Sequence, residues 1–197
     1  IFVKTEIKLT IDIPHAWSLA GLEHKPKGVA QFSSLDEAFD TPILAGPVLE
    51  SYSYEVSDYT FYIHSVGAHG ISSEQLIKDF KQFTEKQVLA FGEFPTSTFS
   101  FLLIGVNETY LHGVEHLNNT VIVLGPTAEW KTKRYESLLA VASHELYHVW
   151  NVKTIRPLEM LPYRFEGPSY SRLGYVYEGI TTFFGDYYLL TSGLITS

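Results

Sequence analysis

The stretch SHELYHVWN, residues 143–151, contains two histidines four positions apart, His144 and His148, with Glu145 next to the first. On a helix, side chains four residues apart lie on one face, with Cβ atoms about 5–6 Å apart. Two imidazoles in that arrangement can bind one Zn²⁺ ion, while the neighbouring carboxylate can accept a proton from a water molecule at the open side. The pattern therefore predicts a zinc site with His144 and His148 as ligands and Glu145 as the general base.

A hydrolytic zinc site normally takes three protein ligands and keeps a fourth position open. Glu178, in the stretch YVYEGITTFF, is a lone carboxylate among aromatic and aliphatic residues. A charge in such surroundings is costly unless it is paired or binds a metal. A proline-rich loop separates His148 from Glu178 and is long enough to return the second segment against the first. We therefore expect Glu178 to complete the ligand set.

Each of these residues also has a simpler explanation. A lone histidine usually lies on the surface or in a core where its hydrogen bonds are satisfied, and a single glutamate on a helix is usually solvated. His112 and His116 are also four apart, but this spacing has no special meaning in a strand. The combination of the H-E-x-x-H pattern, apolar flanks and a second carboxylate favours zinc binding over these explanations.

The elements that must position these residues can be predicted from periodicity. Apolar alternation or short apolar runs predict strands at 2–13, 48–66 (one long strand or a hairpin), 98–106 and 112–125. Apolar residues at helical spacing predict helices at 72–91, 133–154 and 171–191. Loops, with one short element within the first of them, are predicted at the segments rich in Pro or Gly, 14–47 and 155–170. Strands first and helices last indicate an α+β domain.

The composition limits the function further. A net charge of −8 argues against a nucleic-acid partner, which requires a basic surface. No apolar run is long enough to span a bilayer. The chain has no cysteine, so any metal must be held by histidines and carboxylates. This absence fits a cytosolic or a bacterial protein.

Two longer stretches, HELYHVWNVKTIRP (144–157) and YEGITTFFGDYYLL (177–190), resemble the glycyl aminopeptidase family of zinc metallopeptidases, within the gluzincin group. Members of the family commonly continue H-E-x-x-H with W-N-V-K-x-I-R-P, and an E-G-x-T helix follows. The upstream GVEH, residues 113–116, also resembles the family's G-G-x-E-H segment, with His112 where the first glycine usually stands. The resemblance is specific from about residue 112 to 190.

This resemblance implies a thermolysin-like catalytic domain, preceded by an N-terminal β domain and often followed by a PDZ domain. It implies a zinc aminopeptidase whose peptide substrates have small N-terminal residues, Gly or Ala. His144, His148 and Glu178 would be the zinc ligands and Glu145 the general base. The segment from Gly113 to His116 would border the substrate cleft, and Glu115 would bind the α-amino group of the peptide.

The resemblance also implies a division of the chain. Residues 1–47 would be the end of an N-terminal β domain or a linking segment, and 48–197 a catalytic domain truncated at its C-terminus. Such sites usually contain a Tyr or His that donates a hydrogen bond to the developing oxyanion. We expect this donor to lie beyond Ser197, so that the 197-residue chain binds zinc but hydrolyses peptides poorly.

Two alternatives remain from the residues themselves. The first is a non-catalytic, metal-stabilised peptide-binding module, although a structural site would have no need of Glu145. The second is a zinc endopeptidase with the same chemistry, which would not need a carboxylate for a free amine.

Overall fold

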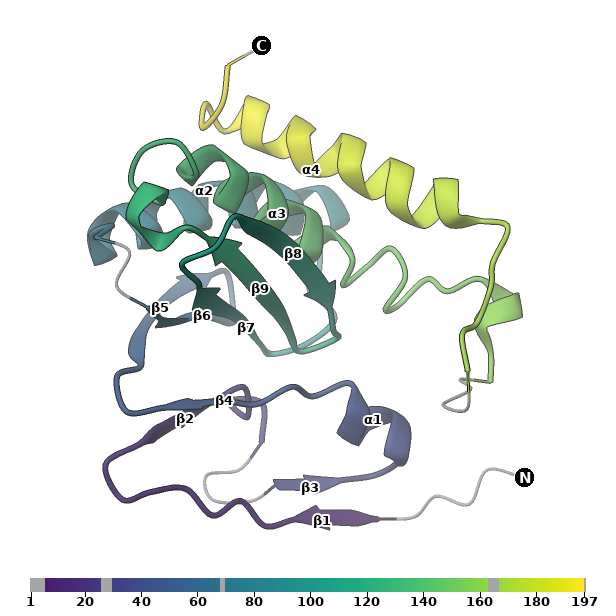
Figure 1. Cartoon of the computed structure of the whole chain (residues 1–197). Coiled ribbons are helices and arrows are strands. Elements are labelled where there is room, and N and C mark those ends of the chain that lie inside the picture. The colour runs from purple at the N-terminus through teal and green to yellow at the C-terminus, as the bar shows by residue number, and fades with distance from the viewer. Residues whose placement is uncertain (1–5, 26–29, 68–69, 163–166, 197) are drawn as a thin grey trace.

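A mixed five-stranded sheet forms the centre of the chain. The computed structural model describes residues 6–25, 30–67, 70–162 and 167–196. The strand order in the sheet is β5 (Glu50–Val56), β6 (Tyr59–Val66), β7 (Thr98–Gly105), β9 (Asn119–Gly125) and β8 (Tyr110–Glu115). The central strands β6, β7 and β9 are parallel, while β5 and β8 run antiparallel at the two edges (Figure 1). Together with the helices, this sheet confirms the predicted α+β class.

Three longer helices pack along the sheet and on one another. They are α2 (Ser73–Phe91), α3 (Tyr135–Tyr147) and α4 (Ile180–Thr191). In Figure 1, α3 lies between the sheet and α4, and contacts join α3 to β8, β9, α2 and α4. No helix within the described residues is both long and apolar enough to cross a bilayer.

The bounds of α2 agree with the sequence prediction because its end signals are local. The hydroxyl of Ser72 accepts a hydrogen bond from the backbone N–H of Gln75 at 3.2 Å. Gly92 ends the helix with a φ of +79°, a left-handed conformation that favours glycine. The predicted strand at 98–106 is likewise confirmed as β7.

The core between the sheet and the helices is rich in phenylalanine. Phe61, Phe80, Phe99 and Phe101 are fully buried, with ring centroids of neighbours about 5–6.5 Å apart. Such edge and tilted ring contacts add to the stabilisation from apolar burial. Trp150, just after α3, stacks on Phe91 of α2 at 4.2 Å between ring centroids. This contact fixes the segment that leaves α3.

Three predicted elements are wrong in their bounds. Residues 112–125 were expected to form one strand, but β8 and β9 form a hairpin whose turn lies at 116–118. Glu115 therefore stands at the end of a strand and not near its start. The helix predicted to reach residue 154 ends at Tyr147, because the backbone N–H of Lys153 turns back to the carbonyl of His148 at 3.0 Å.

The last predicted helix, 171–191, begins later and in a different form. The turn η3 (Tyr175–Gly179) is π-helical and leads directly into α4. The other open question, one strand or a hairpin at 48–66, is settled as the hairpin β5–β6.

The N-terminal segment contains more structure than its sequence indicates. Its short elements are β1 (Ile7–Leu9), β2 (Ser18–Ala20), β3 (Ala30–Phe32), α1 (Leu35–Phe39) and β4 (Leu44–Gly46). The strands form two separate pairs, β1–β3 and β2–β4. The expectation of a single short element within 14–47 is therefore wrong, because three-residue strands are too short to show periodicity. Of the strand predicted at 2–13, only β1 forms, and residues 2–5 lie outside the described residues.

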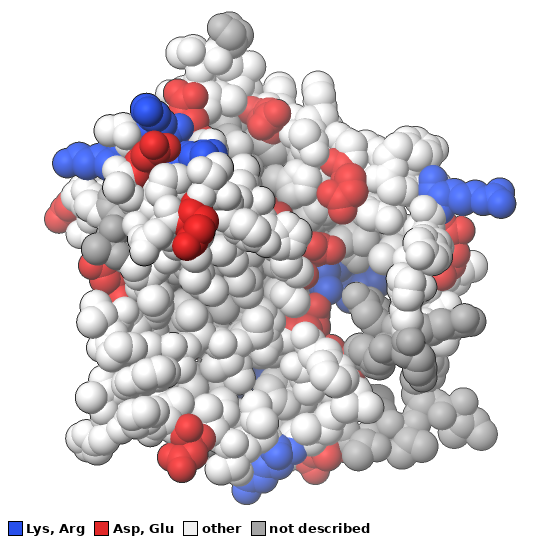
Figure 2. All heavy atoms as spheres, in the orientation of Figure 1, with Lys and Arg blue, Asp and Glu red and all other residues white. Residues whose placement is uncertain are grey.

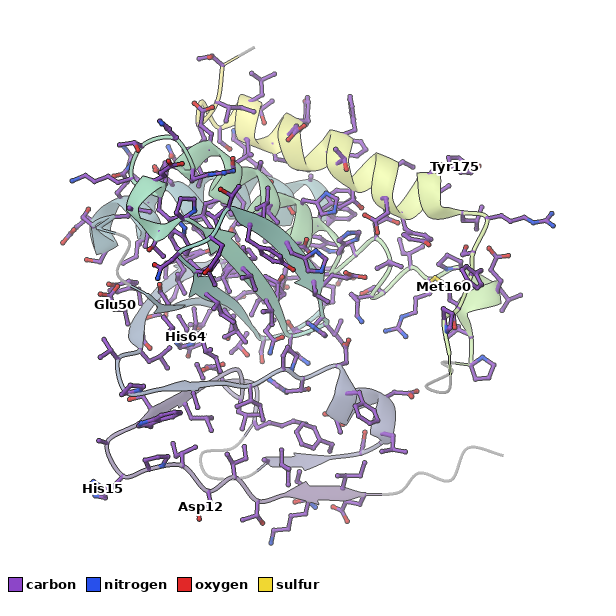
Figure 3. The ribbon with its side chains drawn as sticks, viewed as in Figure 1. Asp12, His15, Glu50, His64, Met160 and Tyr175 are labelled. Carbon is purple, nitrogen blue, oxygen red and sulfur yellow. The ribbon has the colours of Figure 1, made fainter. Side chains whose placement is uncertain are left out.

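Buried polar contacts attach this segment to the main sheet. The amide of Asn119 donates to the carbonyls of Gly21 at 3.3 Å and Pro42 at 3.2 Å. Glu23 accepts a hydrogen bond from the Ser100 hydroxyl at 2.8 Å, and its other carboxylate oxygen lies 3.0 Å from Nε2 of His64. His64 is labelled in Figure 3.

These contacts make the stability of the chain depend on Glu23 at acid pH. Burial alone would raise the pKa of Glu23, but the contacts with His64 and Ser100 outweigh it and lower the pKa from 4.5 to about 2. Because the folded pKa is lower than the unfolded one, the stabilisation is present above about pH 5 and is lost as the pH falls towards 2.

We therefore predict that Glu23→Gln lowers the free energy of unfolding at pH 7 by about 1–3 kcal/mol, the range for hydrogen bonds to charged groups. The difference from the wild type should shrink as the pH is lowered towards 2. Urea unfolding monitored at several pH values measures it, and Glu55→Gln, an exposed glutamate on β5, is the control. A pH-independent difference would contradict the role given to Glu23.

Candidate metal centre

The last turn of α3 carries the two histidines of the motif. Their Nε2 atoms lie 3.0 Å apart. His148 caps the helix with φ −60° and ψ −20°, so the four-residue spacing keeps its helical geometry although the helix ends one residue earlier. Nδ1 of His148 lies 2.9 Å from the carbonyl oxygen of Asn151, to which it donates. This bond places the proton on Nδ1 and leaves the Nε2 lone pair facing His144.

Glu178 reaches the same point from the π-helical turn η3. Its Oε2 atom lies 3.4 Å from Nε2 of His144 and 3.6 Å from Nε2 of His148. The side-chain amide of Asn151 donates to the Val176 carbonyl at 3.2 Å and to the Thr181 hydroxyl at 3.0 Å. Asn151 therefore connects the segment after α3, where the His148 ring is held, to the turn that carries Glu178.

Gly185 lets α4 approach α3 closely, and buried hydrogen bonds hold the two helices together at this point. A Cβ on Gly185 would lie 3.2 Å from the backbone N and Cα of His144. At the same place the Ser143 hydroxyl donates to the Gly185 carbonyl at 2.8 Å, and the Gln87 amide donates to Ser143 at 2.9 Å. Gln87, Ser143 and Gly185 are all buried. These hydrogen bonds hold α3 and α4 together at Ser143, one residue before His144.

The separations of the three atoms suit a zinc ion. A tetrahedral ion with bonds of about 2.0–2.1 Å holds its ligand atoms about 3.3–3.4 Å apart. The three observed separations, 3.0, 3.4 and 3.6 Å, lie around this value. His144, His148 and Glu178 also form a group whose potential ligand atoms all lie within 4.8 Å of one another. The residues present therefore fit the metal that the motif implies.

Glu145 is buried beside this point without a neutralising partner. Its side chain is 5% exposed, and its Oε2 atom is buried with no hydrogen-bond partner among the described residues. Burial, followed by the charges of Glu115 and Glu178, raises the pKa of Glu145 to about 8. A carboxylate in this setting requires a nearby positive charge to remain ionised at neutral pH. A bound cation would supply it.

The edge strand β8 covers Glu145 from the other side. A Cβ on Gly113 would lie 2.1 Å from Oε1 of Glu145, so only a glycine permits this close approach. Two residues further along β8, Glu115 forms a second group with Glu145 and His148, whose potential ligand atoms lie within 4.8 Å of one another. Glu115 thus stands next to the histidine site.

These residues line an open groove of about 670 Å³ between β8 and the helices α3 and α4. Of the seven site residues expected from the sequence, the groove brings six together: Gly113, Glu115, His144, Glu145, His148 and Glu178. His116 is not among them. Its Nδ1 lies 3.1 Å from a carboxylate oxygen of Asp40, and it lines a separate cavity of about 310 Å³. In Figure 2 acidic and basic atoms are both visible to the right of the centre.

No tyrosine lines the groove in the part of the chain that the structure describes. Tyr147 is 7% exposed and stacks on Phe184, with 5.4 Å between ring centroids, and burial raises its pKa to about 12. Tyr175 is 74% exposed. The location of the oxyanion donor therefore stays a prediction.

Sequence reasoning missed the residues that hold the site residues in place. Gln87, Ser143 and Gly185 are ordinary helix residues in sequence, and nothing in their spacing indicates a shared contact. Asn151 could have been found, because it stands inside the W-N-V-K stretch that follows the motif.

Part of the chain matches a known protein family. Residues 137–197 match the family model described as M61 glycyl aminopeptidase. The predicted resemblance to the glycyl aminopeptidases is confirmed. The matched residues include the two histidines and Glu178, whereas Gly113 and Glu115 lie outside the match.

Two solved structures match the chain, and the first of them is similar to it in fold. An aminopeptidase N family protein from Idiomarina loihiensis matches with 28% identity and a TM-score of 0.87, over 98% of this chain and 35% of that one. The chain therefore spans about a third of that protein's length. A mutant two-domain M1 zinc metallopeptidase bound to L-arginine matches with 15% identity and a TM-score of 0.39, over 70% of this chain and 32% of that one. Among curated proteins, none matches the sequence.

The contact between Gly113 and Glu145 gives a direct test of the site. We predict that Gly113→Ala destabilises the chain by about 1–3 kcal/mol, the usual cost of overpacking, and displaces the Glu145 carboxylate. Urea unfolding and a crystal structure of the variant measure the two effects. Gly167→Ala is the control, because a Cβ there meets open space. An unchanged stability with Glu145 in place would contradict the close approach.

Proposed function

We propose that the chain is the metal-binding part of a zinc aminopeptidase, with His144, His148 and Glu178 as ligands and Glu145 as the general base. The observation that carries the proposal is the meeting of the three ligand atoms within 3.0–3.6 Å. The match to the glycyl aminopeptidase family over this segment supports it. With that family, the proposed substrates are peptides with a small N-terminal residue, Gly or Ala.

The separation of Glu115 from the ligands favours an aminopeptidase over an endopeptidase. Its carboxylate lies within 4.8 Å of a ring nitrogen of His148. In a peptide, the N-terminal nitrogen and the first carbonyl carbon are about 2.5 Å apart. A peptide whose amine binds Glu115 would thus present its first carbonyl at the histidine site. We assign Glu115 to the amine and Gly113 to the border of the substrate site, whereas His116, which binds Asp40, is left outside it.

The chain's own residues would perform three tasks in the reaction. A bound zinc ion supplies positive charge that polarises the carbonyl and makes water easier to deprotonate. Glu145, held against Gly113, accepts the proton from the attacking water and returns it to the leaving amine. Glu115 pairs with the substrate's ammonium group and orients its first peptide bond. The Nδ1 bond of His148 to Asn151 keeps the ring in the orientation that ligation requires.

The proposal extends to the architecture. We assign residues 48–197, with the five-stranded sheet and α2–α4, to a thermolysin-like catalytic domain. Residues 1–47 would then be the end of an N-terminal β domain or a linking segment. The separate strand pairs β1–β3 and β2–β4 support this division, because neither pairs with the main sheet.

Metal binding and hydrolysis should respond differently to two substitutions. We predict that Glu145→Gln retains zinc but loses at least ~10²-fold in kcat, because it removes the proton acceptor. His148→Ala should lose both zinc and activity. Elemental analysis after dialysis and peptide hydrolysis measure the two properties. His15→Ala, an exposed histidine of the N-terminal segment (labelled in Figure 3), is the control.

The outcomes separate the functional alternatives. In a protein that also supplies the predicted oxyanion donor, zinc binding without hydrolysis in the wild type, unchanged by Glu145→Gln, would favour a non-catalytic peptide-binding module. Loss of zinc from Glu145→Gln would contradict the role of general base.

The role of Glu115 predicts a requirement for a free amine. A peptide with a free N-terminus should be hydrolysed much faster than its N-acetylated form, and Glu115→Gln should raise KM for the free peptide by about 10-fold or more. Steady-state kinetics on the matched peptide pair measures this. Equal rates for the two peptides would favour the endopeptidase alternative.

A further inference from the structure

Asp40, which follows α1, joins two regions that border the groove. One carboxylate oxygen lies 3.1 Å from Nδ1 of His116 and 2.5 Å from Nζ of Lys153. The other accepts a hydrogen bond from the backbone N–H of Leu117 at 3.0 Å. The side chains of Asp40 and Lys153 are 22% and 7% exposed. Asp40 therefore holds three donors in surroundings where charged hydrogen bonds are strong.

Each of the two regions is adjacent to a residue of the site. His116 and Leu117 directly follow Glu115 in the turn between β8 and β9. Lys153 lies in the segment that leaves α3, and its backbone N–H donates to the carbonyl of His148 at 3.0 Å. Asp40 thus connects the end of the strand that carries Glu115 to the end of the helix that carries His148.

Without this connection the position of Glu115 would be weakly determined. Within the described residues, β8 is an edge strand that pairs with β9 alone. Glu115 also lines both the groove and the neighbouring cavity of about 310 Å³, which Asp40 and Lys153 line as well. Glu115 therefore borders both the groove and the neighbouring cavity. An anchor on the turn is needed to keep it at the groove.

We propose that Asp40, with Lys153, is a positioning residue for Glu115. It holds Glu115 at a distance from the ligands that is spanned by one residue of the substrate, from its amine to its first carbonyl. This inference rests on the proposed function, in which Glu115 binds the substrate's amine. It adds that the N-terminal segment, through Asp40, determines how tightly the amine is bound. Asp40 itself contacts no reacting atom.

The test is a double-mutant cycle between Asp40→Asn and Glu115→Gln, with zinc content measured in every variant. Asp40→Asn should raise KM for unblocked peptides about 10- to 100-fold, as a displaced binding group does, with kcat changed less than about 3-fold and zinc retained. Because Asp40 acts through Glu115, the double variant should have the KM of Glu115→Gln alone. Asp79→Asn is the control, since its carboxylate accepts from Tyr135 at 2.7 Å within the helix layer; its effect should be on stability.

Additive effects of the two substitutions on KM, or an effect of Asp40→Asn on stability alone, would overturn the inference. Lys153→Arg retains the charge and should keep KM within a few-fold of the wild type, whereas Lys153→Met should behave like Asp40→Asn.

A crystal structure of Asp40→Asn tests the inference without any activity. Glu115 should be turned away from His148 and towards the neighbouring cavity. A Glu115 that keeps its place would overturn the positioning role, even if the protein is an active peptidase. Conversely, a displaced Glu115 in a protein that includes the predicted oxyanion donor and still hydrolyses no peptide would overturn the proposed function and leave the positioning role intact.

Discussion

The close contact between α3 and α4 is the constraint on which the site depends. The histidines lie on α3, and Glu178 lies on the turn that leads into α4, so the three ligand atoms meet only if the helices approach closely at one register. Gly185 permits that approach because any side chain there would press against the backbone of His144. The buried hydrogen bonds of Ser143 fix the register, since sliding α4 would leave a buried hydroxyl and carbonyl unpaired. Close packing and satisfied hydrogen bonds therefore act together to fix the relative positions of His144, His148 and Glu178.

A second constraint is the burial of Glu145. The carboxylate lies between α3 and the backbone of β8, where burial and neighbouring acids disfavour its charge. The same acids favour a cation, because Glu115, Glu145 and Glu178 surround the histidine site. The site therefore lowers the stability of the chain when no cation is bound, and it favours the binding of a divalent ion. Local instability of this kind is typical of functional sites, where the surrounding structure compensates for it.

The sequence predicted the parts of the molecule that are encoded by short patterns. The bounds of α2 follow from Ser72 and Gly92, and the proximity of His144, His148 and Glu178 follows from helical spacing and one isolated carboxylate. The features that it did not predict depend on contacts between distant residues. Lys153 and Asp40 are 113 positions apart, and the early end of α3 is caused by backbone hydrogen bonds of the segment that follows it. The split of residues 112–125 into β8 and β9 was missed because the turn at 116–118 is short and the stretches on both sides of it have strand-like composition.

The π-helical form of η3 has a consequence for insertions and deletions. A π-helical turn accommodates an additional residue relative to an α-helix of the same rise. Glu178 lies within this turn, while Gly185 and Thr181 hold the helix beyond it in place. Shortening the turn by one residue would restore regular α-helix and rotate Glu178 by about 100° about the axis, away from the imidazole rings. Chains with the same H-E-x-x-H motif but a shorter turn would therefore keep the fold and lose the proposed third ligand.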